Sequence, residues 1–488
     1  MGPLVEEIFR RGALHPERPA LADSSRTMTY GELVAEARAW TALLQGSLGE
    51  GPRAVGVLLP NCVSFPAVLL GIAGSGHLAV LLPPTLTAPE LRSWIRTAGA
   101  RLVLSEPSAR ARLGAAGGRE GGAGPGGVRV VRFDEAAAPE ILPGDFIAQL
   151  TSGVDRPPKL AVRTQEAVFG EVQDFAAEIG LTEDDTSLVL PSISHSYGLV
   201  GGTLAPLCRG GRVVLGDPRD LEGVIASCRA ERATLLFAVP VLYQRLAGAS
   251  RGGPRDLASV RLCLSAGAPL SRDVEDAFLA RFERWISQDY GCTEAGVITL
   301  GLDRHPLRRG SVGRPVRGRL VEIVSPGGQR LAPGQVGEVV VRTRALARAY
   351  LGDPAPPLPQ GGGFRPGDLG WMTEDGHLFL AGRTSSLIAT PAGLVNPADV
   401  EAAIAGLPGV REVAVVGVPR PGGGEGLKAV VVGEGVTATE IIGHCRRVLG
   451  DREAPEAVEF RAALPRTAAG KVLRRALRDP HAGSSGPP

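Results

Sequence analysis

The sequence predicts an α/β protein with a large N-terminal domain of helix-covered, mainly parallel sheets and a smaller C-terminal α+β domain. Short apolar runs alternate with helical patterns through most of residues 1–384. Continuous apolar strands between amphipathic helices are typical of parallel sheets that are buried on both faces. A chain of 488 residues also exceeds one ordinary core, so two or three domains are expected.

The predicted elements follow one another along the chain in an alternating order. The first set comprises strands at 54–59, 78–82 and 102–104 and helices at 63–72 and 88–98. Further strands are predicted at 146–150, 188–190, 213–215, 234–238 and 262–264. Residues 107–127 are rich in glycine and are expected to form a flexible surface loop within this domain.

A second, smaller domain is predicted to begin at Ser385. The expected domains are residues 1–384, residues 385–479 and a disordered tail at 480–488. Within the smaller domain the patterns predict strands at 413–416 and 428–432 and a helix at 438–449.

Composition excludes several classes of protein. The net charge is only +2 on 53 basic and 51 acidic residues, which gives no electrostatic reason to expect a nucleic acid or an anionic membrane as partner. The six cysteines form no Cys-x-x-Cys pair, which favours a reducing cytoplasm and argues against structural zinc. The uncharged stretch 65–84 contains proline and three glycines, so a buried helix, a turn and a buried strand are expected there rather than a membrane span. The 67 glycines suggest a GC-rich bacterial gene.

The segment 151–159 carries the clearest functional signal. It reads Thr-Ser-Gly-Val-Asp-Arg-Pro-Pro-Lys and follows the apolar strand 146–150. Hydroxyl and glycine residues after a buried strand are typical of phosphate-binding loops, because backbone N–H groups and short O–H donors converge there on an anion.

Five further motifs occur along the chain. Asp289–Glu294 reads Asp-Tyr-Gly-Cys-Thr-Glu, and 464–475 reads Leu-Pro-Arg-Thr-Ala-Ala-Gly-Lys-Val-Leu-Arg-Arg. The others are Gly267-Ala268-Pro269, the segment 364–370 around Asp368, and Gly382-Arg383. Together these motifs resemble those of the acyl-adenylating superfamily of acyl-CoA synthetases, adenylation enzymes and luciferases, over more than three hundred residues.

The resemblance implies a role for each matching residue. Thr293 would contact the α-phosphate of ATP, Glu294 would hold Mg²⁺, and Lys471 would be the catalytic lysine that bridges the carboxylate and the phosphate. Asp368 would bind the ribose hydroxyls, and Ser385 would be the hinge of a mobile C-terminal domain. The remaining residues implied to bind nucleotide or phosphate are Thr151, Ser152, Gly153, Lys159, Gly267, Ala268, Pro269, Tyr290, Gly291 and Arg383.

The phosphate loop departs from the family pattern at its centre. Val154 and Asp155 replace two hydroxyl residues, and Arg156 replaces a glycine. A carboxylate about 4 Å from a triphosphate would cost roughly 4 kcal/mol per charge pair at an effective dielectric constant near 20. This departure favours the interpretation that adenylation is lost or weak, with no nucleotide required.

Two further residues suggest thiol chemistry. Cys292 occupies the variable position of the Tyr-Gly-x-Thr-Glu motif, and His195 matches a position that lines the acyl and pantetheine channels in the family. A cysteine near a histidine can act as a thiolate nucleophile, although a lone cysteine is more often a small hydrophobe. Members of the family that activate α-amino acids use an Asp in the stretch between Thr186 and Gly216 to pair with the ammonium group, and no Asp or Glu occurs there, which disfavours such a substrate. The resemblance then implies a simple acid, with a small aryl acid favoured by analogy with the family.

Three functions therefore compete. The favoured hypothesis is transfer of an acyl group from CoA to the phosphopantetheine thiol of a carrier protein in a biosynthetic pathway, without a nucleotide. The alternative is an ATP- and Mg²⁺-dependent ligase that joins an acid to CoA or a carrier protein through an acyl adenylate. The third is a binding protein without activity, which the retention of Thr293, Glu294, Asp368, Arg383 and Lys471 disfavours.

Overall fold

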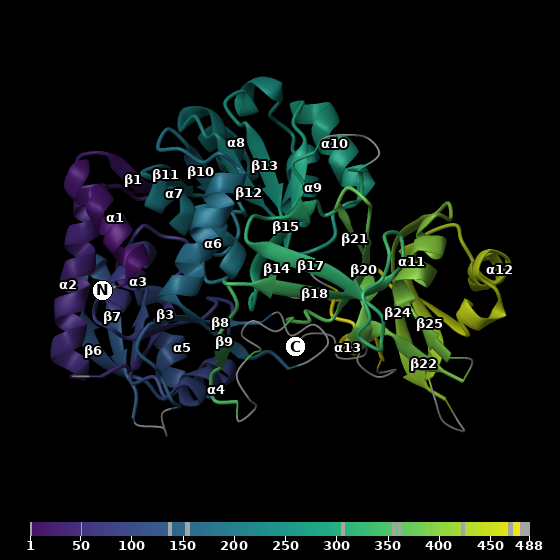
Figure 1. Cartoon of the computed structure of the whole chain (residues 1–488), viewed down its shortest axis with the longest axis horizontal. Helices are drawn as coiled ribbons and strands as arrows, with labels where there is room; N and C mark the ends of the chain where they lie inside the picture. Colours follow the sequence, from purple (N-terminus) through teal and green to yellow (C-terminus); the bar gives the residue numbers. More distant parts are fainter. Residues whose placement is uncertain are drawn as a thin grey trace. The chain divides into compact units, whose positions relative to one another are not determined.

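The structure is a computed structural model of the whole chain. It describes residues 2–49, 51–134, 139–151, 157–303, 308–353, 358, 363–391, 393–420, 425–466 and 472–478. The chain forms two compact units (Figure 1). The first comprises Met1–Ser152, Lys159–Val321 and Val341–Phe364, and the second comprises Gly153–Pro158, Glu322–Val340 and Arg365–Pro488.

The first unit contains two large sheets. In the described residues one sheet has nine strands in the order β16-β15-β14-β13-β12-β10-β11-β1-β2. Its strands are β1 (Pro19–Ala22), β2 (Thr27–Thr29), β10 (Thr186–Val189), β11 (Arg212–Leu215), β12 (Leu235–Ala238), β13 (Leu262–Ser265), β14 (Ile286–Cys292), β15 (Gly296–Leu300) and β16 (Arg314–Pro315). The run from β1 through β11, β10, β12 and β13 to β14 is parallel throughout, as the apolar strand pattern predicts.

The other sheet has eight strands in the order β19-β9-β8-β4-β3-β5-β7-β6 within the described ranges. These are β3 (Ala54–Leu58), β4 (Leu78–Leu81), β5 (Leu102–Ser105), β6 (Arg119–Ala123), β7 (Arg129–Arg132), β8 (Asp145–Leu150), β9 (Leu160–Thr164) and β19 (Ala349–Tyr350). Strands β8, β4, β3 and β5 are parallel, and the outer strands join them antiparallel.

The helices cover these sheets in layers (Figure 1). They are α1 (Pro3–Leu14), α2 (Tyr30–Leu48), α3 (Ser64–Gly74), α4 (Ala88–Ala98), α5 (Arg110–Ala115), α6 (Gln165–Glu178), α7 (Ala205–Arg209), α8 (Leu221–Ala230), α9 (Pro240–Ala247), α10 (Arg272–Phe282) and a π-helix η3 (Tyr197–Leu204). The central core packs α1, α2, α3, α6 and η3 against both sheets, whereas α8, α9 and α10 cover the outer face of the nine-stranded sheet. Side chains alternate between these cores along each strand: Leu235 and Phe237 enter the central core, and Leu236 and Ala238 enter the outer one.

The glycine-rich segment 107–127 is not the flexible loop that its composition predicts. It contains a 3-10 turn (Pro107–Ala109), helix α5, strand β6 and a second 3-10 turn (Pro125–Gly127). Leu113 of α5 is fully buried in the core that covers the outer face of the eight-stranded sheet, and β6 pairs with β7. Composition fails here because one buried leucine and an edge strand suffice to order a segment that is otherwise small and polar.

The segment 65–84 forms the buried helix α3, a turn and the buried strand β4, as expected. Among the described helices, none combines the length and the apolar character needed to cross a bilayer.

The second unit contains smaller sheets and, in its described residues, two main helices; two of its strands, 319–324 and 337–343, run across the boundary with the first unit. A four-stranded sheet has the order β17-β18-β20-β21, a hairpin pairs β22 with β23, and a three-stranded sheet has the order β24-β25-β26. Its elements are β17 (Arg319–Val324), β18 (Gly337–Thr343), β20 (Asp368–Met372), β21 (Leu378–Arg383), β22 (Ile388–Thr390), β23 (Gly393–Val395), α11 (Pro397–Ala405), β24 (Val410–Pro419), β25 (Glu425–Gly433), α12 (Ala438–Leu449), β26 (Ala457–Phe460) and α13 (Arg475–Arg478). The α/β class with a large N-terminal and a smaller α+β C-terminal domain is thus confirmed. The boundary at Ser385 stays a prediction, and the tail 480–488 lies outside the described residues.

Candidate active site

Several predicted site residues lie along one edge of the nine-stranded sheet. Strands β10, β12, β13 and β14 are parallel, so their carboxyl ends meet at the same edge. His195 lies in the loop after β10, Gly267-Ala268-Pro269 follow β13, and Cys292, Thr293 and Glu294 lie at and just after the end of β14. The carboxyl ends of parallel strands are where open α/β sheets usually bind ligands.

The loop that carries His195 is held by two amides. Asn61 donates from Nδ2 to the carbonyl of Pro191 at 3.0 Å and accepts the N–H of Ile193 at 2.9 Å. Gln149 of β8 donates from Nε2 to the carbonyl of Ser194 at 3.1 Å. Gln149 of the eight-stranded sheet and Asn61, in the loop after β3 of that sheet, therefore fix the position of this loop.

The Tyr290-Gly291 pair lies where β14 turns back into β15. Gly291 pairs with Val297, and Cys292 pairs with Gly296. A side chain at Gly291 would collide with the carbonyl oxygen of Gly296, so the glycine is required by the close approach of the two strands. The turn places Thr293 and Glu294 immediately beyond the sheet.

The ends of the predicted phosphate loop are drawn together. Thr151 donates its N–H to the carbonyl of Lys159 at 2.8 Å, and its Oγ1 accepts the N–H of Lys159 at 3.0 Å. The residues between them, Ser152, Gly153, Val154, Asp155 and Arg156, lie outside the described residues.

Tyr350 connects this loop to Glu294. Strand β19 pairs with β9, which sets Tyr350 beside the start of β9. Its Oη donates to Oε1 of Glu294 at 2.8 Å, and the ammonium of Lys159 lies 4.7 Å from the centre of its ring. Lys159 also pairs with Asp353 at 2.6 Å. Burial and the Glu294 carboxylate raise the pKa of Tyr350, so the phenol keeps its proton and donates it.

The sequence gives no sign of Tyr350, because a two-residue strand has no periodic pattern. The structure nevertheless brings two predicted residues to Tyr350, with Lys159 over its ring and Glu294 at its hydroxyl group. Thr151 is joined to them only through its hydrogen bonds to the backbone of Lys159.

A buried ion pair lies close to the loop that carries His195. Arg163 of β9 is fully buried and pairs with Glu171 of α6, which is also buried. Arg163 donates from Nη1 to Oγ of Ser196 at 3.3 Å, and Glu171 accepts the N–H of Val297 at 2.8 Å. The pair thereby joins β9, α6, β15 and the residue next to His195. Sequence reasoning missed it, since neither residue belongs to a motif.

In the second unit, two predicted residues contact each other directly. Asp368 and Arg383 face each other across strands β20 and β21, and Nε of Arg383 donates to Oδ1 of Asp368 at 2.8 Å. Ser385 follows in a 3-10 turn, Thr384–Ser386, whose first residue donates its N–H to the carbonyl of Gly367. Lys471 lies outside the described residues.

The donor set suits magnesium bound together with phosphate. Among the described residues, no three His, Cys, Asp or Glu side chains gather into a site that could hold a metal by itself. Mg²⁺ commonly takes only one or two carboxylates and completes its shell with water and substrate phosphates. The single Glu294 carboxylate fits that pattern.

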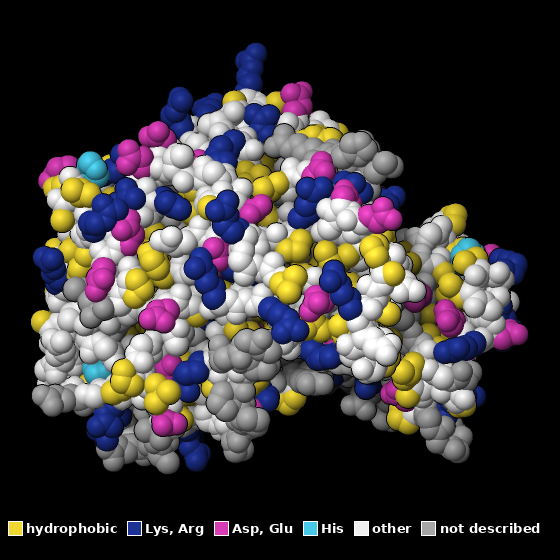
Figure 2. All heavy atoms as spheres, viewed as in Figure 1, with side chains coloured by type: hydrophobic (Ala, Val, Ile, Leu, Met, Phe, Trp, Pro, Cys, Tyr) yellow, Lys and Arg dark blue, Asp and Glu magenta, His cyan; other side chains and the backbone are white. Residues whose placement is uncertain are grey.

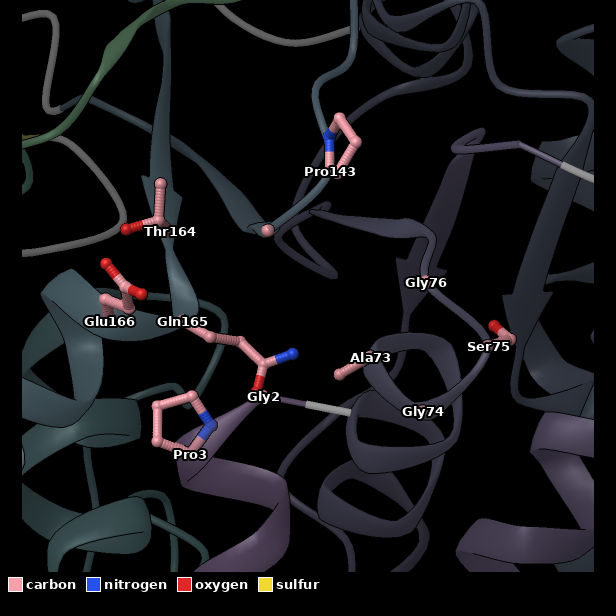
Figure 3. A pocket seen from close by; sticks show the side chains of 11 residues that line it. Gly2, Pro3, Ala73, Gly74, Ser75, Gly76, Pro143, Thr164, Gln165 and Glu166 are labelled. Carbon is pink, nitrogen blue, oxygen red and sulfur yellow. The ribbon is translucent and has the colours of Figure 1, made fainter.

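A separate cavity lies away from this edge (Figure 3). It is lined by Gly2, Pro3, residues 73–76, Pro143, Gly144 and residues 164–166, and the amide of Gln165 lies beside Gly2. Of the predicted site residues that the structure describes, none lines this cavity. On the face of the molecule in Figure 2, Lys and Arg side chains are interspersed with Asp and Glu.

Two family models cover most of the chain. One, described as AMP-binding enzyme, matches residues 8–351, and another, described as AMP-binding enzyme C-terminal domain, matches residues 399–471. The chain belongs to the AMP-binding enzyme family.

Relatives in this family match along the full length. The chain is 31% identical over 478 residues to a feruloyl-CoA synthase of an Amycolatopsis species, covering 96% of this chain and 97% of the relative. It is 30% identical to 4-coumarate–CoA ligase 3 of Oryza sativa subsp. japonica, covering 97% and 91%. The structure of ATP-bound MatB from Rhodopseudomonas palustris superposes with a TM-score of 0.84 at 26% identity, covering 97% and 98%.

These relatives overturn the favoured hypothesis of the sequence analysis. Transfer of an acyl group from CoA to a carrier protein, with adenylation lost, is wrong, because the full-length relatives are named as CoA ligases. The changes at Val154, Asp155 and Arg156 affect one loop only, and the other motifs of the family are kept. AMP-binding family enzymes use ATP, Mg²⁺ and CoA, so the expectation that no nucleotide is required has no support. The ligase alternative fits the relatives.

Proposed function

We propose that this enzyme joins a carboxylic acid to CoA in an ATP-dependent reaction that passes through an acyl adenylate. The observation that carries the proposal is the Glu294 carboxylate, which follows the carboxyl end of β14 and accepts a hydrogen bond from Tyr350, whose ring faces the ammonium of Lys159 at the end of the predicted phosphate loop. The names of the full-length relatives, feruloyl-CoA synthase and 4-coumarate–CoA ligase, support both the reaction and an aryl acid as substrate.

Each half-reaction makes one bond and breaks one bond. In the first, a carboxylate oxygen of the acid attacks the α-phosphorus of ATP, and the bond to pyrophosphate breaks. In the second, the sulfur of CoA attacks the acyl carbon, the bond to AMP breaks, and the thiol proton passes to His195 or to solvent. Bound Mg²⁺ supplies positive charge that offsets the charge of the phosphates.

The residues of this chain would position the reactants. Glu294 would hold the metal, and Thr293 and Lys159 would lie on the phosphates. Lys471 would bridge the carboxylate and the phosphate, where a fixed charge stabilises the transition state. Asp368 and Arg383, which are paired in the second unit, would serve the ribose, and the second domain would turn about Ser385 between the two half-reactions.

Pyrophosphate exchange tests the proposal. Purified enzyme with ATP, Mg²⁺ and labelled pyrophosphate should form labelled ATP only when an acid is added. Benzoate, cinnamate, 4-hydroxycinnamate, malonate and octanoate would sample the acid classes, with an aryl acid giving the fastest exchange. Failure of every acid to support exchange above the acid-free rate would contradict the proposal.

We also propose that the altered phosphate loop changes the affinity for ATP without removing its use. Val154 cannot donate a hydrogen bond, and the charge of Asp155 opposes the phosphates. Restoring the family residues (Val154→Thr, Asp155→Thr, Arg156→Gly) should lower the KM for ATP by about tenfold, with little change in the KM for the acid. Initial rates at varied ATP measure this effect, and an unchanged or higher KM for ATP in the triple variant would show that the loop does not limit ATP binding.

A further inference from the structure

A second carboxyl group, that of Asp289, lies at the same sheet edge and is not used by the proposed reaction. Asp289 follows Gln288, the last residue of β14 that pairs with the parallel neighbour β13. Its side chain is partly buried, and it makes no hydrogen bond or ion pair within the part of the chain that the structure describes. Its carboxyl oxygens are not among the fully buried atoms that lack a partner, so part of the group stays accessible to a ligand.

The described neighbours of Asp289 do not donate a hydrogen bond to its carboxyl group. Tyr197 lies near enough to interact with it electrostatically, but its Oη donates to the carbonyl of Ala238 at 3.3 Å. Glu171 is the other charged neighbour, and it is already occupied by Arg163 and by the N–H of Val297. Burial, together with the Glu171 charge, raises the pKa of Asp289. Among the described residues, the neighbours of Asp289 therefore repel its charge and donate no hydrogen bond to it.

The location of Asp289 links it to the acid. Asp289 is on the strand that ends in Cys292, and its neighbour Tyr197 is two residues after His195, so Asp289 and Tyr197 belong to the two segments that the resemblance implies at the acyl channel. Strands rise about 3.3 Å per residue, which places Asp289 roughly 10 Å along β14 from its end, next to Thr293. A ligand group that met Asp289 would lie far from the carboxylate being activated near Thr293.

We propose that Asp289 determines specificity by accepting a hydrogen bond from a hydroxyl or amino group at the end of the acid remote from its carboxylate. This inference rests on the proposed function and narrows its substrate class to acids that carry such a donor. Asp289 lies outside the stretch between Thr186 and Gly216 in which the family places an acidic partner for its substrate, so the sequence alone does not single it out.

Three acids of nearly the same shape test the proposal: cinnamate, 4-hydroxycinnamate and 4-aminocinnamate. Wild type should favour one or both donor-bearing acids over cinnamate by about tenfold or more in kcat/KM. Asp289→Ala should remove that preference, chiefly by raising KM, while the rate with cinnamate stays equal or rises. Asp289→Asn, which keeps an acceptor oxygen, should retain part of the preference for both donor-bearing acids.

Asp184→Asn is the matched control. Asp184 is 93% exposed and precedes β10, at the opposite edge of the same sheet, so its variant should behave as wild type. Equal losses on all three acids in Asp289→Ala, or no preference for a donor in wild type, would overturn the proposal. Calorimetric titration of the three acids in the absence of ATP gives the same comparison for binding alone. Asp289 is therefore tested even if exchange fails and the proposed function falls.

Discussion

Replacing Glu294 by Gln is expected to lower acid-dependent pyrophosphate exchange by about 10²- to 10³-fold. The change keeps the shape of the side chain and an oxygen that can accept from Tyr350, but it removes the one negative charge that Glu294 offers to a metal. Removing a single preorganised electrostatic contact commonly costs an enzyme two to three orders of magnitude in rate, about 2.7–4 kcal/mol. Exchange rates measured over a range of Mg²⁺ concentrations should show that more metal is needed for half of the maximal rate.

Tyr350→Phe distinguishes the contribution of the Glu294 charge from that of the hydrogen bond that orients the Glu294 carboxylate. This variant removes only the hydrogen bond to Glu294 and keeps the ring that faces Lys159. Groups that orient a metal ligand typically contribute about 10- to 100-fold to affinity, so a smaller loss with the same shift in Mg²⁺ dependence is expected. Exchange by Glu294→Gln within a few-fold of wild type, at every Mg²⁺ concentration, would exclude Glu294 as the metal ligand.

The second large effect concerns stability. Glu171→Ala is expected to destabilise the first unit by about 3–5 kcal/mol, because it leaves the fully buried guanidinium of Arg163 without its counter-charge. It also removes the acceptor for the N–H of Val297. The midpoint of the first urea-induced transition, followed by tryptophan fluorescence, should fall accordingly.

Two further variants make the reason for that effect testable. Glu166→Ala removes an exposed carboxylate from the first turn of the same helix and should cost no more than about 1 kcal/mol. The double variant Arg163→Met, Glu171→Met removes both charges and should regain most of the lost stability, since well-packed apolar pairs often replace buried ion pairs at little cost. A double variant less stable than Glu171→Ala would show that the uncompensated charge is not the cause.

The fold could be predicted from the sequence because a strand that is buried on both faces of a parallel sheet appears in the sequence as a continuous apolar run. The helices at 88–98 and 438–449 have the bounds that their patterns indicate, and most strand predictions agree within one or two residues. The segment 107–127 failed because its order depends on one buried leucine and on the pairing of β6 with β7. Neither feature has a local signature.

The candidate site could be predicted only where a motif exists. Thr151, Lys159 and Glu294 lie in motifs, yet Tyr350, which contacts both Lys159 and Glu294, is contributed by a two-residue strand almost two hundred residues after the loop. Arg163 and Glu171 were missed because a buried charge is indistinguishable from a surface charge in one sequence. Asp289 was within a recognised motif, but its lack of a partner becomes visible only when its neighbours are known.

The most direct test of the central claim is a chase experiment on the wild-type enzyme. Enzyme in high concentration is mixed with ATP, Mg²⁺ and 4-hydroxycinnamate, without CoA, and the quenched products are separated by chromatography and mass spectrometry. We expect acyl-AMP and pyrophosphate in equal amounts, close to one per enzyme, and conversion of the acyl-AMP to acyl-CoA and free AMP when CoA is then added. Formation of ADP and phosphate, or of acyl-CoA with no acyl-AMP before it and no AMP after it, would contradict the account.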